Sequence, residues 1–299
     1  MSTAIPFAPV ARGGSTLGEV PGTVQQALLL SRYQFRDYLR SRRFILMMII
    51  VAAIGAILSF VLAYFNSAAA VQGLLSSSNA FYGSAWAGGV TIVIIFAGII
   101  FGGDAIAGEF QNKTGYFLMG LPIKRTTVYV GKFLAALAAS LVAVFFYLAI
   151  LLANGAYYLH GNAFPAALGE SFLISLLYLF ALLGSVFLFS SLFKNSLYAV
   201  LVVAVLFLFG FSLLQGIITD LVKVEPWFII TYADQVIGYP FLSTLPPHVS
   251  TVTLMGARGA ILTTTSWNPT YLEGFAIMIG YFVLTAFAGL WLFEREEFT

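Results

Sequence analysis

The sequence predicts an all-α integral membrane fold: six transmembrane helices, preceded by an interfacial amphipathic helix and with a cytoplasmic elbow between the second and third. Of its 299 residues, 60% are apolar and only 9% carry a charge. An average soluble domain has about 45–50% apolar and about 25% charged residues, so this chain has too few charges to cover a water-exposed surface. Its mean hydropathy of +0.96 agrees with burial in lipid.

Six stretches are long and apolar enough to cross a bilayer, whose hydrocarbon core of about 30 Å needs about 20 helical residues. The fourth and fifth are separated only by Lys194 and Asn195. One helix across both would be more than twice as long as the bilayer is thick, so a hairpin is expected there. The predicted spans are residues 44–65, 84–103, 128–153, 171–193, 197–219 and 274–293.

The chain before the first span divides into two parts. Residues 1–22 have Gly and Pro but no continuous apolar run, which predicts a flexible cytoplasmic tail and not a signal peptide. Residues 23–43 predict an amphipathic helix in the membrane interface, with its apolar side in the acyl boundary and arginines at anionic head groups. The alternative is a simple positive flank of the first span. The apolar positions are Val24, Leu28, Phe35 and Leu39, and the arginines are Arg32, Arg36, Arg40, Arg42 and Arg43.

The distribution of Lys and Arg predicts the orientation. Of the 14 basic residues, only Lys223 and Arg258 lie on one side of the predicted spans. All the others lie in the tail, the first helix, the elbow, the Lys194 turn or the C-terminal end. By the positive-inside rule these segments face the cytoplasm, and an even number of spans places both termini there. The expected location is the cell membrane, crossed several times.

Residues 220–273 form a long outer connection between the fifth and sixth spans. Its prolines interrupt apolar pieces that are too short to cross a membrane, and its aromatic residues, such as Trp227, Trp267 and Tyr271, suit a membrane interface. Two structures are compatible with this composition. Small helices could dip into the outer leaflet and cap the bundle, or the segment could be an ordered surface loop without a role in transport.

The elbow, residues 104–127, has a higher density of charged residues than the other long connection, residues 220–273. Glu109 and Lys113 are four residues apart with the acid first, which favours a helical ion pair worth about 0.3–0.5 kcal/mol at an exposed site. Gly115 and Pro122 divide the elbow into an amphipathic helix, a turn and the start of the next span. Because a two-residue turn would reverse the chain, so long a charged detour indicates a surface that contacts another molecule.

An ordered pattern of residues runs through the elbow into the third span. An acidic residue is followed by a Thr and Gly pair, a Leu-rich turn, a Pro with basic residues, and a Gly-Lys pair. These are Glu109, Thr114, Gly115, Leu118, Leu121, Pro122, Lys124, Arg125, Gly131 and Lys132. Except for the reversed order of Thr114 and Gly115, the pattern resembles the elbow of ABC-2 type transporter permeases, and the layout of helices extends the resemblance over nearly the whole chain.

This resemblance implies the transmembrane permease subunit of an ATP-binding cassette exporter. Such a permease pairs with a second permease chain, identical or related, and forms its substrate path at the dimer interface. Cytoplasmic ABC ATPase subunits drive it, so ATP and Mg²⁺ are expected in that partner and no cofactor in this chain. The residues implied in ATPase coupling are Asp104, Glu109, Gly115, Pro122, Lys124 and Arg125 in the elbow and Lys194 in the fourth-to-fifth turn.

The residue types that are missing argue against several kinds of functional site. The predicted spans hold no ionisable side chain well inside the hydrocarbon, which argues against proton coupling. Around Gly131 and Lys132, Thr126 and Phe133 stand where a phosphate loop needs Gly and Ser or Thr, so no nucleotide site is expected. With no cysteine and only two histidines, we expect no metal site, no catalytic residues and no intramembrane enzyme. Membrane lipids are expected partners, and nucleic acid is not.

Polar residues within and beside the spans are candidates for a substrate path, although such side chains commonly bond the backbone of their own helix. They are Ser59, Tyr64, Asn66, Thr91, Ser212 and Gln215. An uncharged interior suits lipids, lipid-linked glycans, peptides or hydrophobic drugs. The alternative function is a non-transporting membrane assembly or scaffold protein, in which a short polar turn could replace the elbow without loss of function.

Overall fold

The computed structural model describes residues 22–112, 123–159, 164–255 and 261–295. Within these ranges, six helical segments are long and apolar enough to span a membrane, which confirms the predicted number of spans. They are α2 (Arg42–Tyr64), α4 with its continuation (Ser78–Gln111), α7 (Arg125–Leu159), α8 (Ala167–Leu192), the fifth span (Ser196–Val222) and α12 (Tyr271–Arg295).

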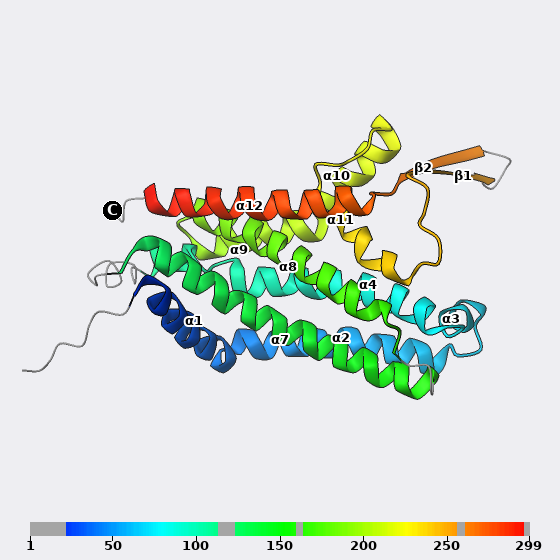
Figure 1. Cartoon of the computed structure of the whole chain (residues 1–299), viewed down its shortest axis with the longest axis horizontal. Helices are drawn as coiled ribbons and strands as arrows, with labels where there is room; N and C mark the ends of the chain where they lie inside the picture. The colour runs from blue at the N-terminus through cyan, green and yellow to red at the C-terminus, as the bar shows by residue number, and fades with distance from the viewer. Residues whose placement is uncertain (1–21, 113–122, 160–163, 256–260, 296–299) are drawn as a thin grey trace, which may run out of the picture.

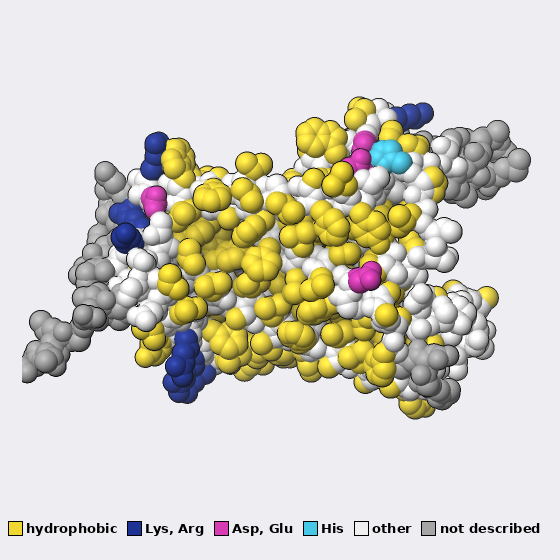
Figure 2. Space-filling model, viewed as in Figure 1, with side chains coloured by type: hydrophobic (Ala, Val, Ile, Leu, Met, Phe, Trp, Pro, Cys, Tyr) yellow, Lys and Arg dark blue, Asp and Glu magenta, His cyan; other side chains and the backbone are white. Residues whose placement is uncertain are grey.

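The long helices run side by side along the long axis of the molecule (Figure 1). One end of this bundle holds α1 (Thr23–Arg40) and the C-terminal end of α12, and it is called the charged end below. The opposite end holds the hairpin of β1 (Val249–Met255) and β2 (Ile261–Trp267) and is called the hairpin end. Between the two ends, the visible face is covered by apolar side chains (Figure 2), as expected for a surface in contact with lipid.

Helix α4 (Ser78–Ala97) forms the centre of the bundle. Of the most apolar stretch of 18 residues in its span, 72% is buried within the chain. The corresponding share is 22% for α2, 17% for the fifth span and 11% for α12. Trp86 donates from Nε1 to Ser171 Oγ of α8 at 3.0 Å, and Tyr147 of α7 donates from its hydroxyl to Ala85 O at 2.7 Å. Gly89 permits this approach of α7, because a Cβ there would lie 1.8 Å from the Tyr147 hydroxyl oxygen.

Two spans contain π-helical turns, which hold more residues per turn than an α-helix. Helix α4 passes into η1 (Gly98–Gly102) just before the elbow. The fifth span is built from α9 (Ser196–Val205), α10 (Phe211–Ile217) and two π-helical turns. These turns are η3 (Leu206–Gly210) and η4 (Ile218–Val222).

The predicted N-terminal helix is present as α1, but it ends at Arg40 and not at residue 43. Ser41 leaves the helical conformation, and its hydroxyl caps α2 by accepting from Phe44 N at 3.2 Å. Helix α1 packs against α7 through a face that includes Ala27 and Tyr38, both buried. The Val24 and Leu28 stripe remains exposed, so a lipid-facing side is available, and placement in the membrane interface stays a prediction.

The outer connection contains short helices that pack on the bundle. Helix α11 (Ile230–Ala233) contacts α12, and η5 (Asp234–Phe241) contacts α4 and α8. Ser171 of α8 donates to Ile237 O at 2.5 Å. The β1–β2 hairpin, in which Val249 pairs with Trp267, was not predicted. Its signal in the sequence is two runs rich in Val, Ile and Thr, at residues 249–255 and 261–267, on either side of a Gly-containing segment.

Candidate functional site

At the charged end, Asp104 follows η1 and contacts two other helices, α2 and α9. The Asp104 carboxylate pairs with the Arg43 guanidinium of α2 and accepts from Ser196 Oγ of α9 at 3.3 Å. In α5 (Ala107–Gln111), Gln111 accepts from Ser196 N at 2.8 Å. The elbow is therefore bonded to the first residue of α9, which places it beside the fourth-to-fifth turn.

A second ion pair lies deeper in the elbow. Lys132 of α7 donates from Nζ to Glu109 Oε1 and, at 2.8 Å, to Ala105 O. The side chains of Lys132 and Glu109 are only 7% and 15% exposed. The bonds of Glu109 therefore include Lys132, 23 residues away, whereas its predicted partner Lys113 lies outside the described residues. Such a pair is expected to fix the elbow against α7, because either charge left alone would be buried without compensation.

Uncharged hydrogen bonds complete the support of the elbow. Ser190 of α8 accepts from Ile106 N at 3.0 Å and from Ala107 N at 3.2 Å, so its hydroxyl satisfies two backbone donors at the start of α5. The Tyr38 hydroxyl of α1 donates to Phe101 O at 2.9 Å. Burial raises the pKa of Tyr38, so this hydroxyl stays a donor at neutral pH. Helices α2, α7, α8 and α9 bond the elbow, and α1 bonds η1 directly before it.

The residues predicted for ATPase coupling fall into three groups. Asp104 and Glu109 form the internal pairs described above, and Arg125 donates from Nη1 to Glu294 O at 2.9 Å near the end of α12. Lys124 and Lys194 are exposed at the charged end. Gly115 and Pro122 lie outside the described residues. Contact of this set with an ATPase stays a prediction.

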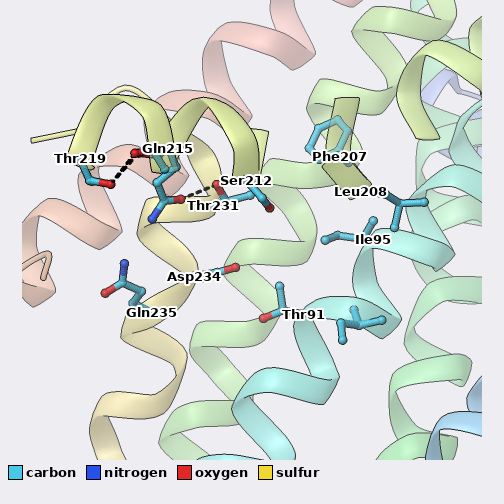
Figure 3. Close-up of a pocket in the computed structure, with 12 residues that line it drawn as sticks. Thr91, Ile95, Phe207, Leu208, Ser212, Gln215, Thr219, Thr231, Asp234 and Gln235 are labelled. Carbon is cyan, nitrogen blue, oxygen red and sulfur yellow. Dashed lines mark hydrogen bonds between the residues drawn. The ribbon is translucent and has the colours of Figure 1, made fainter. Parts of the chain in front are cut away.

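A polar cavity of about 530 Å³ lies between α4, the fifth span and the α11–η5 segment. It brings together three of the six predicted substrate-path residues (Figure 3). Thr231 donates to Gln215 Oε1 at 2.8 Å, so the Gln215 amide is held at the cavity wall. Thr91 bonds Ala87 O of its own helix at 3.1 Å. The polar lining residues are Thr91, Ser212, Gln215, Thr219, Thr231, Asp234 and Gln235.

The other three predicted path residues do not line this cavity. Ser59 donates to Gly55 O of its own helix at 2.9 Å. Tyr64 is 72% exposed and stacks on Phe60 at the end of α2. The backbone carbonyl of Asn66 accepts from the side chain of Gln72 at 2.7 Å. A substrate path through these residues would be separate from the cavity.

Four polar residues of the cavity are not among the predicted path residues, and Asp234 is the one of them that carries an ionisable group. It begins η5, in the outer connection and outside the six spans, and its half-buried side chain lines the polar cavity. This burial raises the pKa of Asp234 to about 7. The sequence feature that could have indicated Asp234 is an Asp-Gln pair inside the apolar run from residue 227 to 241. A carboxyl group that gains or loses its proton near neutral pH is common at binding sites.

The Asp234 carboxyl group predicts a pH-dependent stability. The ordinary pKa of this carboxyl is 3.8 and its folded pKa is raised to about 7, so the folded state holds the extra proton between these values. Its contribution to stability is therefore fully present below about pH 4 and is lost as the pH rises toward 7. Asp234→Asn, which cannot ionise, is expected to show no such loss.

The measurement is the melting temperature of the wild type and of Asp234→Asn in detergent at a series of pH values from 4 to 8. The difference between the two proteins cancels the titration of all other groups. We expect the variant to gain stability relative to the wild type as the pH rises. A difference that does not change with pH would contradict a raised pKa at this site.

The comparison with protein families shows to which family the chain belongs. A model of the family described as ABC-2 family transporter protein matches residues 28–298. The chain belongs to the ABC-2 transporter family. No curated protein matches the chain. The family match extends from α1 to beyond α12 and so includes the elbow and the polar cavity. This ABC-2 chain is therefore a membrane permease of an ABC transporter, which is a different component of the transporter from the ATPase.

Proposed function

We propose that this ABC-2 permease is the transmembrane subunit of an exporter in the cell membrane, driven by a separate ATPase that docks at the charged end. Both termini and the elbow then face the cytoplasm, in agreement with the distribution of Lys and Arg. The bonds between the elbow and the surrounding helices are the main support for this proposal. The elbow follows the central helix α4 and η1 and bonds to α2, α7, α8 and α9, while α1 bonds η1 directly before it, so a force applied there would reach most of the bundle.

The exposed faces of the permease support a dimer. Only 17% of the most apolar 18-residue stretch of the fifth span is buried within one chain. Most of this span must therefore be covered by lipid or by a second permease chain. The same span forms one wall of the polar cavity. A dimer that paired the fifth spans would place the two cavities close to the interface and form the substrate path there.

The cavity suits a substrate with an apolar body and a polar group. Its wall includes apolar side chains such as Ile95 and Phe207, while Gln215, Asp234 and Gln235 offer hydrogen-bonding groups. Burial of the polar group beside these side chains would compensate for the loss of its hydration, as at most small-molecule sites.

Reversing the charges of Lys124 and Lys194 together, as Lys124→Glu with Lys194→Glu, is expected to reduce attachment of the ATPase at least tenfold. Both side chains are exposed, so the fold should remain intact. The permease would be tagged after Thr299 and purified in mild detergent. Mass spectrometry would then measure the amount of a co-purified subunit with a phosphate loop, and hydrolysis of ATP would be assayed in the same sample.

Lys223→Glu is the control, because it makes the same substitution at one exposed lysine in the outer connection. It should leave the complex unchanged. Arg125 is excluded from the test since its reversal would also disturb the end of α12. An ATPase that stays bound to the double variant would contradict the role of the two lysines. If no ATPase co-purifies with the wild type, a membrane scaffold becomes the better account.

A further inference from the structure

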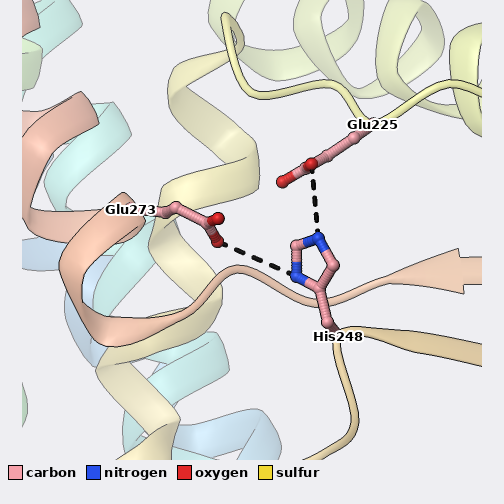
Figure 4. A group of neighbouring side chains, drawn as sticks. All are labelled: Glu225, His248 and Glu273. Atoms are coloured by element: carbon pink, nitrogen blue, oxygen red, sulfur yellow. Dashed lines mark ion pairs between the residues drawn. The ribbon is translucent and has the colours of Figure 1, made fainter.

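Three potential metal ligands meet near the hairpin end, although they are far apart in the sequence (Figure 4). Glu225 follows the fifth span, His248 precedes β1, and Glu273 lies in the first turn of α12. One imidazole nitrogen of His248 and one oxygen of each glutamate lie within 4.8 Å of one another. The fold therefore brings a histidine and two carboxylates into one cluster outside the polar cavity.

The environment of the imidazole defines which nitrogen is free. His248 Nδ1 lies 3.0 Å from Asn268 O, a carbonyl that can only accept, so Nδ1 carries the hydrogen. In the neutral ring, Nε2 then presents a lone pair, and it lies 3.3 Å from Glu225 Oε2, which is also an acceptor. These two acceptors would repel each other unless a positive charge lay between them. A backbone carbonyl on the other ring nitrogen is the usual support of a metal-binding histidine.

Each carboxylate accepts a hydrogen bond at one oxygen and keeps its other oxygen available as a ligand. Glu225 Oε1 accepts from the Tyr232 hydroxyl at 2.8 Å, while its Oε2 points toward His248. Glu273 Oε2 accepts from Thr270 N at 2.7 Å in a capping box at the start of α12. Within the described ranges, neither glutamate has a Lys or Arg ion-pair partner. Two negative charges and a neutral imidazole form a site that suits a divalent cation.

We propose that Glu225, His248 and Glu273 bind a divalent transition metal ion of the zinc class, with a water molecule as fourth ligand. Imidazole with carboxylates suits this class, whereas Ca²⁺ and Mg²⁺ prefer oxygen ligands alone. With metal–ligand bonds of about 2.0–2.2 Å, neighbouring ligands of a tetrahedral site lie about 3.3–3.6 Å apart. The 3.3 Å between His248 Nε2 and Glu225 Oε2 already meets this spacing.

Glu273 Oε2 lies 3.8 Å from His248 Nδ1, the ring nitrogen opposite to the one that faces Glu225 (Figure 4). Glu273 would therefore complete the site by a change of side-chain conformation that brings a carboxylate oxygen to the Nε2 side, for which its 40% exposure leaves room. The bound ion would then connect the end of the fifth span, the base of the hairpin and the start of α12. This role is independent of transport and of the ATPase, so the site can be tested on the permease alone.

The test is isothermal titration of Zn²⁺ into the full-length permease, purified in detergent without a polyhistidine tag. We expect one ion per chain with a dissociation constant of about 10 µM or tighter, and no comparable binding of Mg²⁺. His248→Gln should weaken binding at least tenfold. His160→Gln is the matched control, because His160 is the only other histidine in the sequence, and it should bind as the wild type does.

Glu225→Gln provides a second variant for the case that His248→Gln does not fold, as judged by gel filtration. Co²⁺ adds a direct readout, because a tetrahedral site gives the bound ion intense visible absorption bands, which Glu225→Gln should weaken. Absence of Zn²⁺ binding in the wild type would overturn the proposal, and a proton on His248 would then explain the contact with Glu225. Binding that is unchanged in both His248→Gln and Glu225→Gln would overturn it as well.

Discussion

Replacing Lys132 by methionine is expected to lower the free energy of unfolding by about 3–5 kcal/mol, the range found when one partner of a buried ion pair is removed. Methionine keeps the length and packing of the side chain, but Glu109 loses a charged partner while its side chain is only 15% exposed. The Ala105 carbonyl also loses its bond to Nζ. The measurement is thermal unfolding in detergent, with gel filtration to detect aggregation.

Two further variants separate the ion pair from other effects of the substitution. Lys124→Met removes an exposed lysine eight residues earlier and should leave the melting temperature nearly unchanged. Glu109→Gln combined with Lys132→Met removes both charges and should recover more than half of the loss, because no buried charge remains. If the double variant is no more stable than Lys132→Met, the ion pair is not the cause.

The second large effect is expected for Ser190→Ala. The hydroxyl of Ser190 is the acceptor for two backbone N–H groups at the start of α5, on Ile106 and Ala107. Each buried donor left without a partner costs about 1–3 kcal/mol, so the expected loss of stability is about 2–6 kcal/mol. Hydrogen exchange followed by mass spectrometry should also show faster exchange in residues 103–111, because the elbow is no longer held by α8.

Ser191→Ala is the control at the neighbouring position. Ser191 is buried to the same extent, but its hydroxyl donates to Phe187 O within its own helix. Alanine there removes a local bond and leaves the helix backbone paired, so a change within about 1 kcal/mol is expected. Equal losses for Ser190→Ala and Ser191→Ala would contradict the special role of Ser190.

The spans were predictable because lipid requires long apolar helices, and hydropathy reports this requirement directly. Their ends were less accurate. The second span was predicted to begin at residue 84 but begins at Ser78, since Ser77 caps the helix by accepting from Ala80 N at 3.1 Å. Polar residues such as Asn79 in the first turns lower the hydropathy and hide the true start.

The partners of the charged residues could not be predicted in the same way. Sequence spacing identifies ion pairs along one helix, such as Glu109 with Lys113, but Lys132 reaches Glu109 from another helix. The same holds for Arg43 and Asp104, which are 61 residues apart in sequence. Asp234 and the glutamates beside His248 lie in a connection with several prolines, where no helical or strand period relates one residue to the next.

The π-helical turn η1 determines how the elbow is oriented toward the other helices. A π turn holds about one residue more than an α turn, and each residue of an α-helix advances the direction of the side chains by about 100°. The extra residue in η1 therefore changes the direction in which the chain leaves α4, compared with an uninterrupted α-helix. Directly after this turn, Asp104 pairs with Arg43 and the Ile106 N–H bonds the hydroxyl of Ser190. The number of residues between α4 and the elbow therefore matters as much as their identity, and a one-residue deletion in η1 would turn these groups away from their partners.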